Sequence, residues 1–180
     1  MRRAECSVLA DPLGGKAGRV RNDEVDATDA RLLLALGESP RASVLGLAEQ
    51  LGLSRNTVQA RLAGLEARGV LGSFERRIDP AALGYPLTAF VTVQVVQRML
   101  AEVAAALDEV PEVVEVLGIS GQTDLLVQVV ARDADDLYRI SGQLLGTEGV
   151  ERTSTSLVMR RLVEHRLAPL LERIAGPRQA

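Results

Sequence analysis

The chain contains 180 residues, 47% of them hydrophobic, and carries a formal net charge of −3. These values allow one or two small domains with buried cores, and no apolar run reaches the roughly 20 residues of a membrane-spanning helix. The single cysteine, Cys6, excludes an internal disulfide and a cysteine-rich metal site. Because the first residues also lack the apolar stretch of a secretory signal, we expect a cytoplasmic protein with no metal, no cofactor and no membrane association.

Residues 1–23 show no sustained hydrophobic periodicity and are interrupted by Pro12, Gly14, Gly15 and Gly18. This pattern predicts a flexible N-terminal tail. Three basic residues in its second half could hold DNA phosphates, but a solvated leader is the simpler interpretation.

Residues 24–78 carry the pattern of a small helical domain. A first helix can be capped by Asp26 or Thr28, because either side chain can accept a hydrogen bond from a backbone N–H at the helix start. Ser43 can cap a second helix in the same way. Residues 70–78 predict a short strand, and three helices followed by such a strand form a winged helix-turn-helix.

The second and third helices form the most informative motif of the chain. Leu47, Ala48 and Leu51 give the second helix a single apolar stripe. Gly52 can take the left-handed conformation of the turn, and Ser54 can cap the third helix. The outward face of the third helix is polar and basic, with side chains of the types that bond base edges and phosphates in a DNA major groove. Two ordinary core helices are the alternative, but this face favours binding of double-stranded DNA. The predicted contacts are Ser54, Arg55, Asn56, Thr57, Gln59, Arg61, Arg76 and Arg77.

The basic charge is local to this motif. Residues 54–77 carry a net charge of +3, whereas the last 100 residues carry a net charge of −4. A patch of this size predicts weak binding by one copy, so we expect two such domains to act together.

Residues 79–87 contain three proline and glycine interruptions and predict a linker. Over residues 88–165 the pattern changes to the order βαββαβ, which predicts an α+β ferredoxin-like domain of four antiparallel strands backed by two helices. We expect strands over 88–96, 113–119, 123–131 and 150–161, and helices over 100–110 and 137–145. Thr92 and Gln94 on the open face suit a surface covered by a second sheet, so we expect dimerisation there.

Residues 166–180 form a C-terminal extension. Its stretch from Leu167 to Ile174 can form a short amphipathic helix that packs on a neighbour, and a frayed end is an equally good interpretation.

Four motifs occur in an order that is found in one family. They are the stretch Leu47–Leu71, the linker Ile78-Asp79-Pro80, the loop Ser120-Gly121-Gln122-Thr123-Asp124 and the segment Gly149–Met159. Through them the chain resembles the Lrp/AsnC, or feast/famine, regulators from about Asp26 to Arg161. The resemblance implies a winged helix-turn-helix joined to a RAM/ACT-like ferredoxin domain. It also implies a cytoplasmic transcriptional regulator whose homodimers assemble into octamers or similar particles, and which binds an amino acid or related effector between subunits.

The loop between the second and third strands is the candidate effector site. Gly121 lets the backbone approach a ligand closely, and the Asp124 carboxylate suits an α-ammonium group. The loop amides and the hydroxyls of Ser120 and Thr123 could take the α-carboxylate. With the family's threonines on the last strand, the predicted set is Ser120, Gly121, Gln122, Thr123, Asp124, Thr153 and Thr155. The alternative is that Asp124 only accepts hydrogen bonds from backbone amides of the turn.

The chain departs from the family pattern at two places. Ala63-Gly64 stand where the family commonly has basic residues, so we expect fewer phosphate contacts from the second half of the third helix. No tyrosine follows Asp124, which makes the expected effector site less polar.

Two other functions remain open from the sequence. Sirohaem decarboxylases share this layout and use histidine and arginine around a tetrapyrrole, but the chain has one histidine, His165, beyond the last strand. No nucleophile–base set, metal-spaced cluster or phosphate-binding glycine loop is present, so we expect no enzyme activity. The third possibility is an oligomerising interaction protein that has lost DNA binding.

Overall fold

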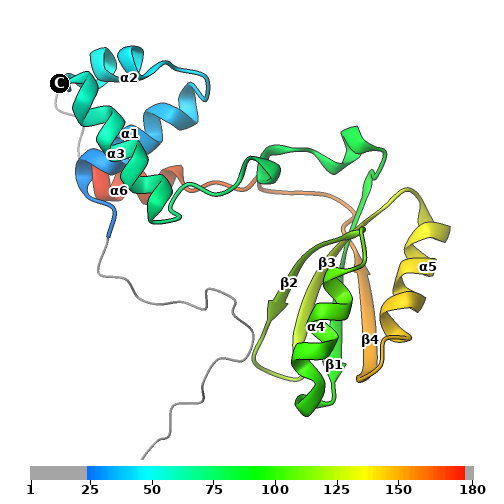
Figure 1. The fold of residues 1–180 in the computed structure, drawn as a ribbon. Coiled ribbons are helices and arrows are strands. Elements are labelled where there is room, and N and C mark those ends of the chain that lie inside the picture. Colours follow the sequence, from blue (N-terminus) through cyan, green and yellow to red (C-terminus); the bar gives the residue numbers. More distant parts are fainter. Residues whose placement is uncertain (1–23, 177–180) are drawn as a thin grey trace, which may run out of the picture. The chain divides into compact units, whose positions relative to one another are not determined.

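The computed structural model describes residues 24–176, which form two compact units (Figure 1). One unit holds residues 78–161, and the other combines residues 24–77 with residues 162–176. The predicted N-terminal tail and Cys6 lie outside the described residues. Within residues 24–176, no helix combines the length and apolar character needed to cross a membrane.

The unit of residues 24–77 and 162–176, which we call the head, starts with three helices that begin at polar caps. They are α1 (Ala27–Glu38), α2 (Val44–Leu51) and α3 (Arg55–Ala67). The caps Asp26, Ser43 and Ser54 each accept a hydrogen bond from a backbone N–H of the first turn, as the sequence predicts. Gly52, with a φ of 64°, takes the left-handed conformation that ends α2 and turns the chain into α3.

The apolar stripes of these helices meet in one small core. The core consists of Leu32, Ala35, Leu47, Ala48, Val58 and Leu65, all buried. Each fully buried leucine contributes about 1.5–3 kcal/mol to folding. The core therefore fixes the angle between α2 and α3 and leaves the opposite face of α3 exposed.

The predicted wing strand is wrong. Residues 70–78 contain a 3₁₀ helix, η1 (Phe74–Arg77), and a second one, η2 (Pro80–Leu83), follows. A strand needs a partner to satisfy its backbone N–H and C=O groups, and the described part of the head contains no other strand to supply one. The apolar residues of the segment 70–78 indicated a strand, but no partner strand is present beside them in the described part of the head.

The second unit is the predicted ferredoxin-like domain. Its strands are β1 (Leu87–Val95), β2 (Val113–Gly118), β3 (Leu125–Ala131) and β4 (Val150–Leu157), in the antiparallel order β2-β3-β1-β4. The helices are α4 (Leu100–Asp108), preceded by the 3₁₀ helix η3 (Gln97–Met99), and α5 (Ala134–Leu145).

Strand β4 ends four residues earlier than predicted. Its partner β1 starts at Leu87. The backbone hydrogen bond from the Val158 N–H to the Thr88 carbonyl is the last one between β4 and β1. Pro86, just before β1, has no backbone N–H. Residues beyond 158 therefore have no strand beside them.

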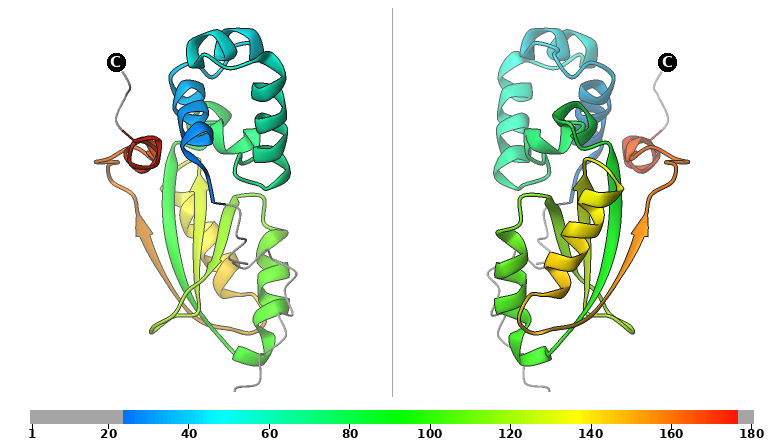
Figure 2. Two further views of the ribbon diagram at one scale, coloured as in Figure 1. Left: turned by 90° about the vertical axis from the view of Figure 1, so that its left-hand side faces the viewer. Right: turned by 90° about the vertical axis from the view of Figure 1, so that its right-hand side faces the viewer.

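The two faces of the sheet differ. Val91, Val93, Val127 and Val129 point to one face and are completely buried with residues of α4 and α5. The ribbon views show the strands and these helices from two sides (Figure 2). Thr92 and Gln94 alternate with these valines and lie on the other face. That face is covered by no helix of this domain, as predicted.

The C-terminal extension forms a helix, α6 (Ala168–Ala175). The predicted helix is thus confirmed, and its neighbour is α1 of the same chain, so α6 belongs to the head.

Candidate DNA-binding face and effector site

The N-terminal half of α3 presents a polar face. Arg55, Asn56 and Gln59 are exposed, and their spacing of i, i+1 and i+4 places them on one side of the helix. Val58 and Leu65 are completely buried on the other side. The helix therefore offers guanidinium and amide groups at its N-terminal end, where the helix dipole also favours an anion.

Two of the predicted contact residues, Ser54 and Thr57, stabilise the N-terminus of α3. The Ser54 hydroxyl accepts the Thr57 N–H at 3.1 Å and lies 2.8 Å from the Thr57 hydroxyl. Both hydroxyls are exposed at the helix N-terminus, but their first role is to order the turn.

Arg61, also predicted as a DNA contact, is held by carboxylates of α1. Its Nη1 lies 2.6 Å from Asp26 Oδ2 and 2.7 Å from Asp29 Oδ1. Hydrogen bonds to Asp26 and then Asp29 raise the pKa of the Arg61 guanidinium. This geometry gives Arg61 a structural role in the joint between α1 and α3, and the two ion pairs weaken its attraction for a phosphate.

Asp29 is the centre of this joint. Its side chain is 5% exposed and also accepts a hydrogen bond from Arg68 Nη2 at 2.9 Å. Arg61 and Arg68, seven residues apart, lie on the same side of α3. An acidic residue within the apolar pattern of α1 was the sequence signal for such a joint, since a buried carboxylate requires a cationic partner.

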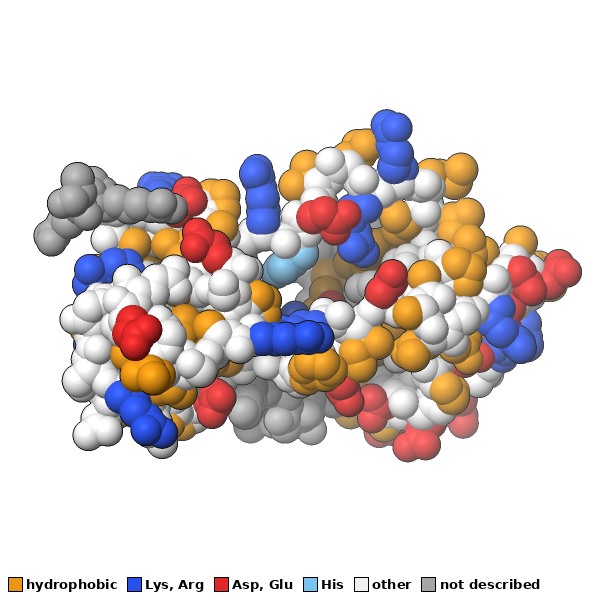
Figure 3. Space-filling model, turned by 90° about the horizontal axis from the view of Figure 1, so that it is seen from above, with side chains coloured by type: hydrophobic (Ala, Val, Ile, Leu, Met, Phe, Trp, Pro, Cys, Tyr) orange, Lys and Arg blue, Asp and Glu red, His pale blue; other side chains and the backbone are white. Residues whose placement is uncertain are grey.

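The remaining predicted cations, Arg76 and Arg77, lie on η1 and are exposed. In Figure 3, basic side chains are scattered among acidic and uncharged ones over the face shown. With Arg61 and Arg68 in ion pairs, the basic patch is smaller than the sequence count indicates.

The candidate effector loop joins β2 to β3. The Asp124 carboxylate accepts the Val95 N–H at 2.9 Å and a hydrogen bond from the Gln97 side-chain amide. These bonds tie the loop to the end of β1, so Asp124 accepts a backbone amide, although one from β1 rather than from its own turn. Gly121 has a φ of 131°, and a Cβ there would meet no atom within 4 Å. Backbone conformation, not close contact within the chain, therefore requires this glycine.

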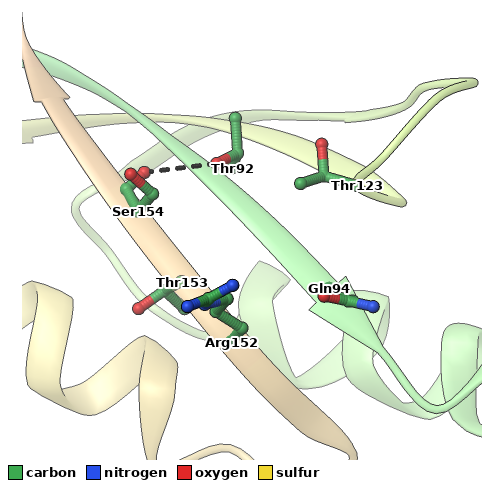
Figure 4. A pocket seen from close by; sticks show the side chains of 6 residues that line it. All are labelled: Thr92, Gln94, Thr123, Arg152, Thr153 and Ser154. Atoms are coloured by element: carbon green, nitrogen blue, oxygen red, sulfur yellow. Dashed lines mark hydrogen bonds between the residues drawn. The ribbon is translucent and has the colours of Figure 1, made fainter.

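A hollow of about 430 Å³ opens beside this loop (Figure 4). Its lining is polar, and the Thr92 hydroxyl donates to the Ser154 carbonyl at 3.4 Å. Residues from β1, the loop and β4 meet there: Thr92, Gln94, Thr123, Arg152, Thr153 and Ser154.

The structure brings only part of the predicted effector set together. Thr123 and Thr153 line the hollow, whereas Ser120, Gly121 and Gln122 are exposed and do not. Thr155 points to the helix-covered side of the sheet, where its hydroxyl lies 3.0 Å from that of Ser141 on α5.

Sequence reasoning missed Arg152 as a member of this site. Within the described part of the chain, no carboxylate pairs with this arginine. Its place on the open face comes from the register that pairs it with Gln94, which the sequence alone does not give. In residues 24–176, no cluster of His, Cys, Asp or Glu is arranged to hold a metal ion.

A second network of charges holds α5 to the sheet. Hydrogen bonds from the Arg132 side chain and backbone, and then from Arg139, keep the pKa of Asp136 far below its usual range. Arg139 also pairs with Glu112, which stands just before β2. None of these residues lines the hollow, and the network stabilises the ferredoxin-like domain in which the hollow lies.

Known families match both units. Residues 25–66 match the AsnC-type helix-turn-helix domain, and residues 88–168 match the Lrp/AsnC ligand binding domain.

Individual relatives agree along most of the chain. An HTH-type transcriptional regulator of Pyrococcus horikoshii is 32% identical over 142 residues, which covers 79% of this chain and 92% of the relative. The proline dehydrogenase transcriptional activator of Rhodobacter capsulatus is 34% identical, with 79% of this chain and 95% of the relative covered. The solved structure of the feast or famine regulatory protein from M. tuberculosis, complexed with L-methionine, has a TM-score of 0.71 at 28% identity and covers 80% of this chain and 98% of that one. The chain therefore belongs to the Lrp/AsnC family of transcriptional regulators, with a helix-turn-helix domain followed by the family's ligand-binding domain.

Proposed function

We propose that this protein binds double-stranded DNA in a sequence-specific manner through α3, and that an amino acid or similar small molecule modulates the binding. The observation that carries the first part is the exposed row of Arg55, Asn56 and Gln59 at the N-terminal end of α3. Arginine bonds guanine bidentately, and asparagine and glutamine do the same with adenine, so these residue types read base edges.

Assembly of several copies follows from the small basic patch. Arg61 and Arg68 are paired with Asp26 and Asp29, which leaves few unpaired cations for phosphates. Weak binding by one head becomes useful when two heads read two half-sites. The open face of the sheet, which carries Thr92 and Gln94, suits a second copy as a dimer interface. Further assembly of dimers into octamers or similar particles would multiply the contacts.

The effector part is supported by the hollow beside the loop. Arg152 supplies a cation for an α-carboxylate, and the hydroxyls of Thr92 and Thr123 supply hydrogen bonds. A relative of known structure is complexed with L-methionine. Asp124 already accepts two hydrogen bonds. We therefore propose that Asp124 holds the loop in place and that the residues of the hollow recognise the ligand.

Selection from a random duplex library by the full-length protein tests DNA recognition. We expect a defined motif to be enriched, and Arg55→Ala to weaken binding to it about 5- to 150-fold, which corresponds to about 1–3 kcal/mol. Arg98→Ala, an exposed arginine of η3 in the other unit, is the matched control. Absence of an enriched motif, or equal affinities of the two variants, would contradict the proposal.

Thermal-shift measurements with each of the common amino acids, combined with light scattering, test the effector. We expect at least one of them to raise Tm or change the particle mass, and Arg152→Ala to remove that response. A response that survives in Arg152→Ala would contradict the assignment of the hollow. No response to any amino acid would contradict the effector proposal and leave DNA recognition unaffected.

A further inference from the structure

The C-terminal helix covers a side of α1 that the core of the head leaves open. Ala30 is completely buried, yet it is absent from the core cluster, to which Leu32 and Ala35 belong. At about 100° per residue, Ala30 points away from that cluster, to the opposite side of α1. Helix α6 packs on α1 and contributes no residue to the cluster. It is therefore the element that covers Ala30.

Helix α6 uses one side for this contact. Leu171 and Ala175, one turn apart, are its partly buried residues, whereas the neighbouring Leu170 is 55% exposed. Alanines on both helices allow their backbones to approach closely, and Leu171 supplies the apolar area. Two adjacent leucines of the same helix thus differ in whether they face α1.

Acidic residues at the start of α1 in turn hold α3. Asp29 bonds Arg61 and Arg68 of α3, and Asp26 bonds Arg61 as well. A continuous set of contacts therefore runs from α6 through α1 to α3. Within residues 24–176 the chain returns to the head at Arg161–Leu162, ahead of α6.

We propose that α6 is a buttress of the DNA-binding head: its docking on α1 keeps α3 in place for DNA recognition. The stability part stands on the packing alone, and the DNA part rests on the proposed function. In this account the C-terminal extension is a structural part of the head.

The test compares Leu171→Asp with Leu170→Asp in the full-length protein. Hydrogen exchange of α1 peptides should be at least about tenfold faster in Leu171→Asp than in wild type, and unchanged in Leu170→Asp. Peptides of α4 and α5 should keep wild-type protection in both variants, which shows that the chain remains folded. Leu171→Ala with Leu170→Ala as its control repeats the comparison if the aspartate variant does not fold.

Affinity for the selected duplex should fall in Leu171→Asp and not in Leu170→Asp. Equal α1 exchange in the two variants would overturn the buttress. Faster α1 exchange with undiminished DNA affinity would overturn the connection to α3. If wild type itself binds no duplex, the proposed function fails, while the exchange comparison still decides whether α6 supports α1.

Discussion

Replacing Asp29 with asparagine removes one negative charge from between two arginines and nearly preserves the shape of the side chain. The Asp29 oxygens lie 2.7 Å from Arg61 Nη1 and 2.9 Å from Arg68 Nη2. A hydrogen bond to a charged group contributes about 1.5–3 kcal/mol, and breaking a fully buried ion pair costs about 3–5 kcal/mol. The Arg61 and Arg68 side chains are 32% and 24% exposed and regain water, so the penalty is smaller than the sum. We expect Asp29→Asn to lower the unfolding free energy of the head by about 2–4 kcal/mol.

Hydrogen exchange of peptides from α1 and α3 measures this loss directly. The chain has no tryptophan, and its tyrosines, Tyr85 and Tyr138, lie in the other unit, so intrinsic fluorescence does not report on the head. A loss of about 2–4 kcal/mol speeds exchange of the most protected amides by about 30- to 1,000-fold. Glu49→Gln, an exposed carboxylate of α2, is the control and should change stability by less than about 0.5 kcal/mol. Equal exchange in the two variants would refute the role assigned to Asp29.

Three further predictions follow from single contacts. A backbone N–H in the first turn of α1, and then Arg61, hold the pKa of Asp26 below its usual 3.8. The stability that Asp26 contributes is therefore complete above about pH 5 and is lost as the pH falls below about 4 toward the lower pKa of the folded state. Urea unfolding from pH 6 to pH 3 should show a shallower decline for Asp26→Asn, and identical slopes would argue against this ion pair. Ser54→Ala should destabilise the start of α3 by about 1 kcal/mol, seen as faster exchange of its first-turn amides, whereas unchanged exchange would mean that the hydroxyl caps nothing. Asp124→Asn should lower the Tm of the ligand-binding domain without any ligand, because its carboxylate accepts the Val95 N–H; a Tm equal to that of wild type would return Asp124 to the list of candidate ligand contacts.

The features that the sequence predicted well depend on neighbours close along the chain. Ser43 and Ser54 cap helices because their hydroxyls reach an N–H three residues ahead. Val91 and Val93 are buried, and Thr92 is not part of their core, because strand side chains alternate between faces. Such relations have a fixed period and can be derived from one sequence.

The features that the sequence predicted poorly depend on a partner distant along the chain. The ion pairs of Arg61 were not predicted, because its partners Asp26 and Asp29 stand 35 and 32 residues earlier. Arg152 belongs to the hollow because β4 pairs with β1 in a register that one sequence does not specify. The strand predicted over residues 70–78 failed for the same reason, because its existence required a partner strand.

The specificity of DNA binding tests the central claim most directly. The affinity of the full-length protein for the selected duplex, divided by its affinity for a scrambled duplex of equal length, should be on the order of 10³ or more at physiological salt. In the double variant Asn56→Ala, Gln59→Ala this ratio should fall about 5- to 150-fold for each lost base contact, which corresponds to about 1–3 kcal/mol, while affinity for the scrambled duplex stays near that of wild type. A ratio unchanged by the two substitutions would contradict the claim that the exposed face of α3 reads the DNA sequence.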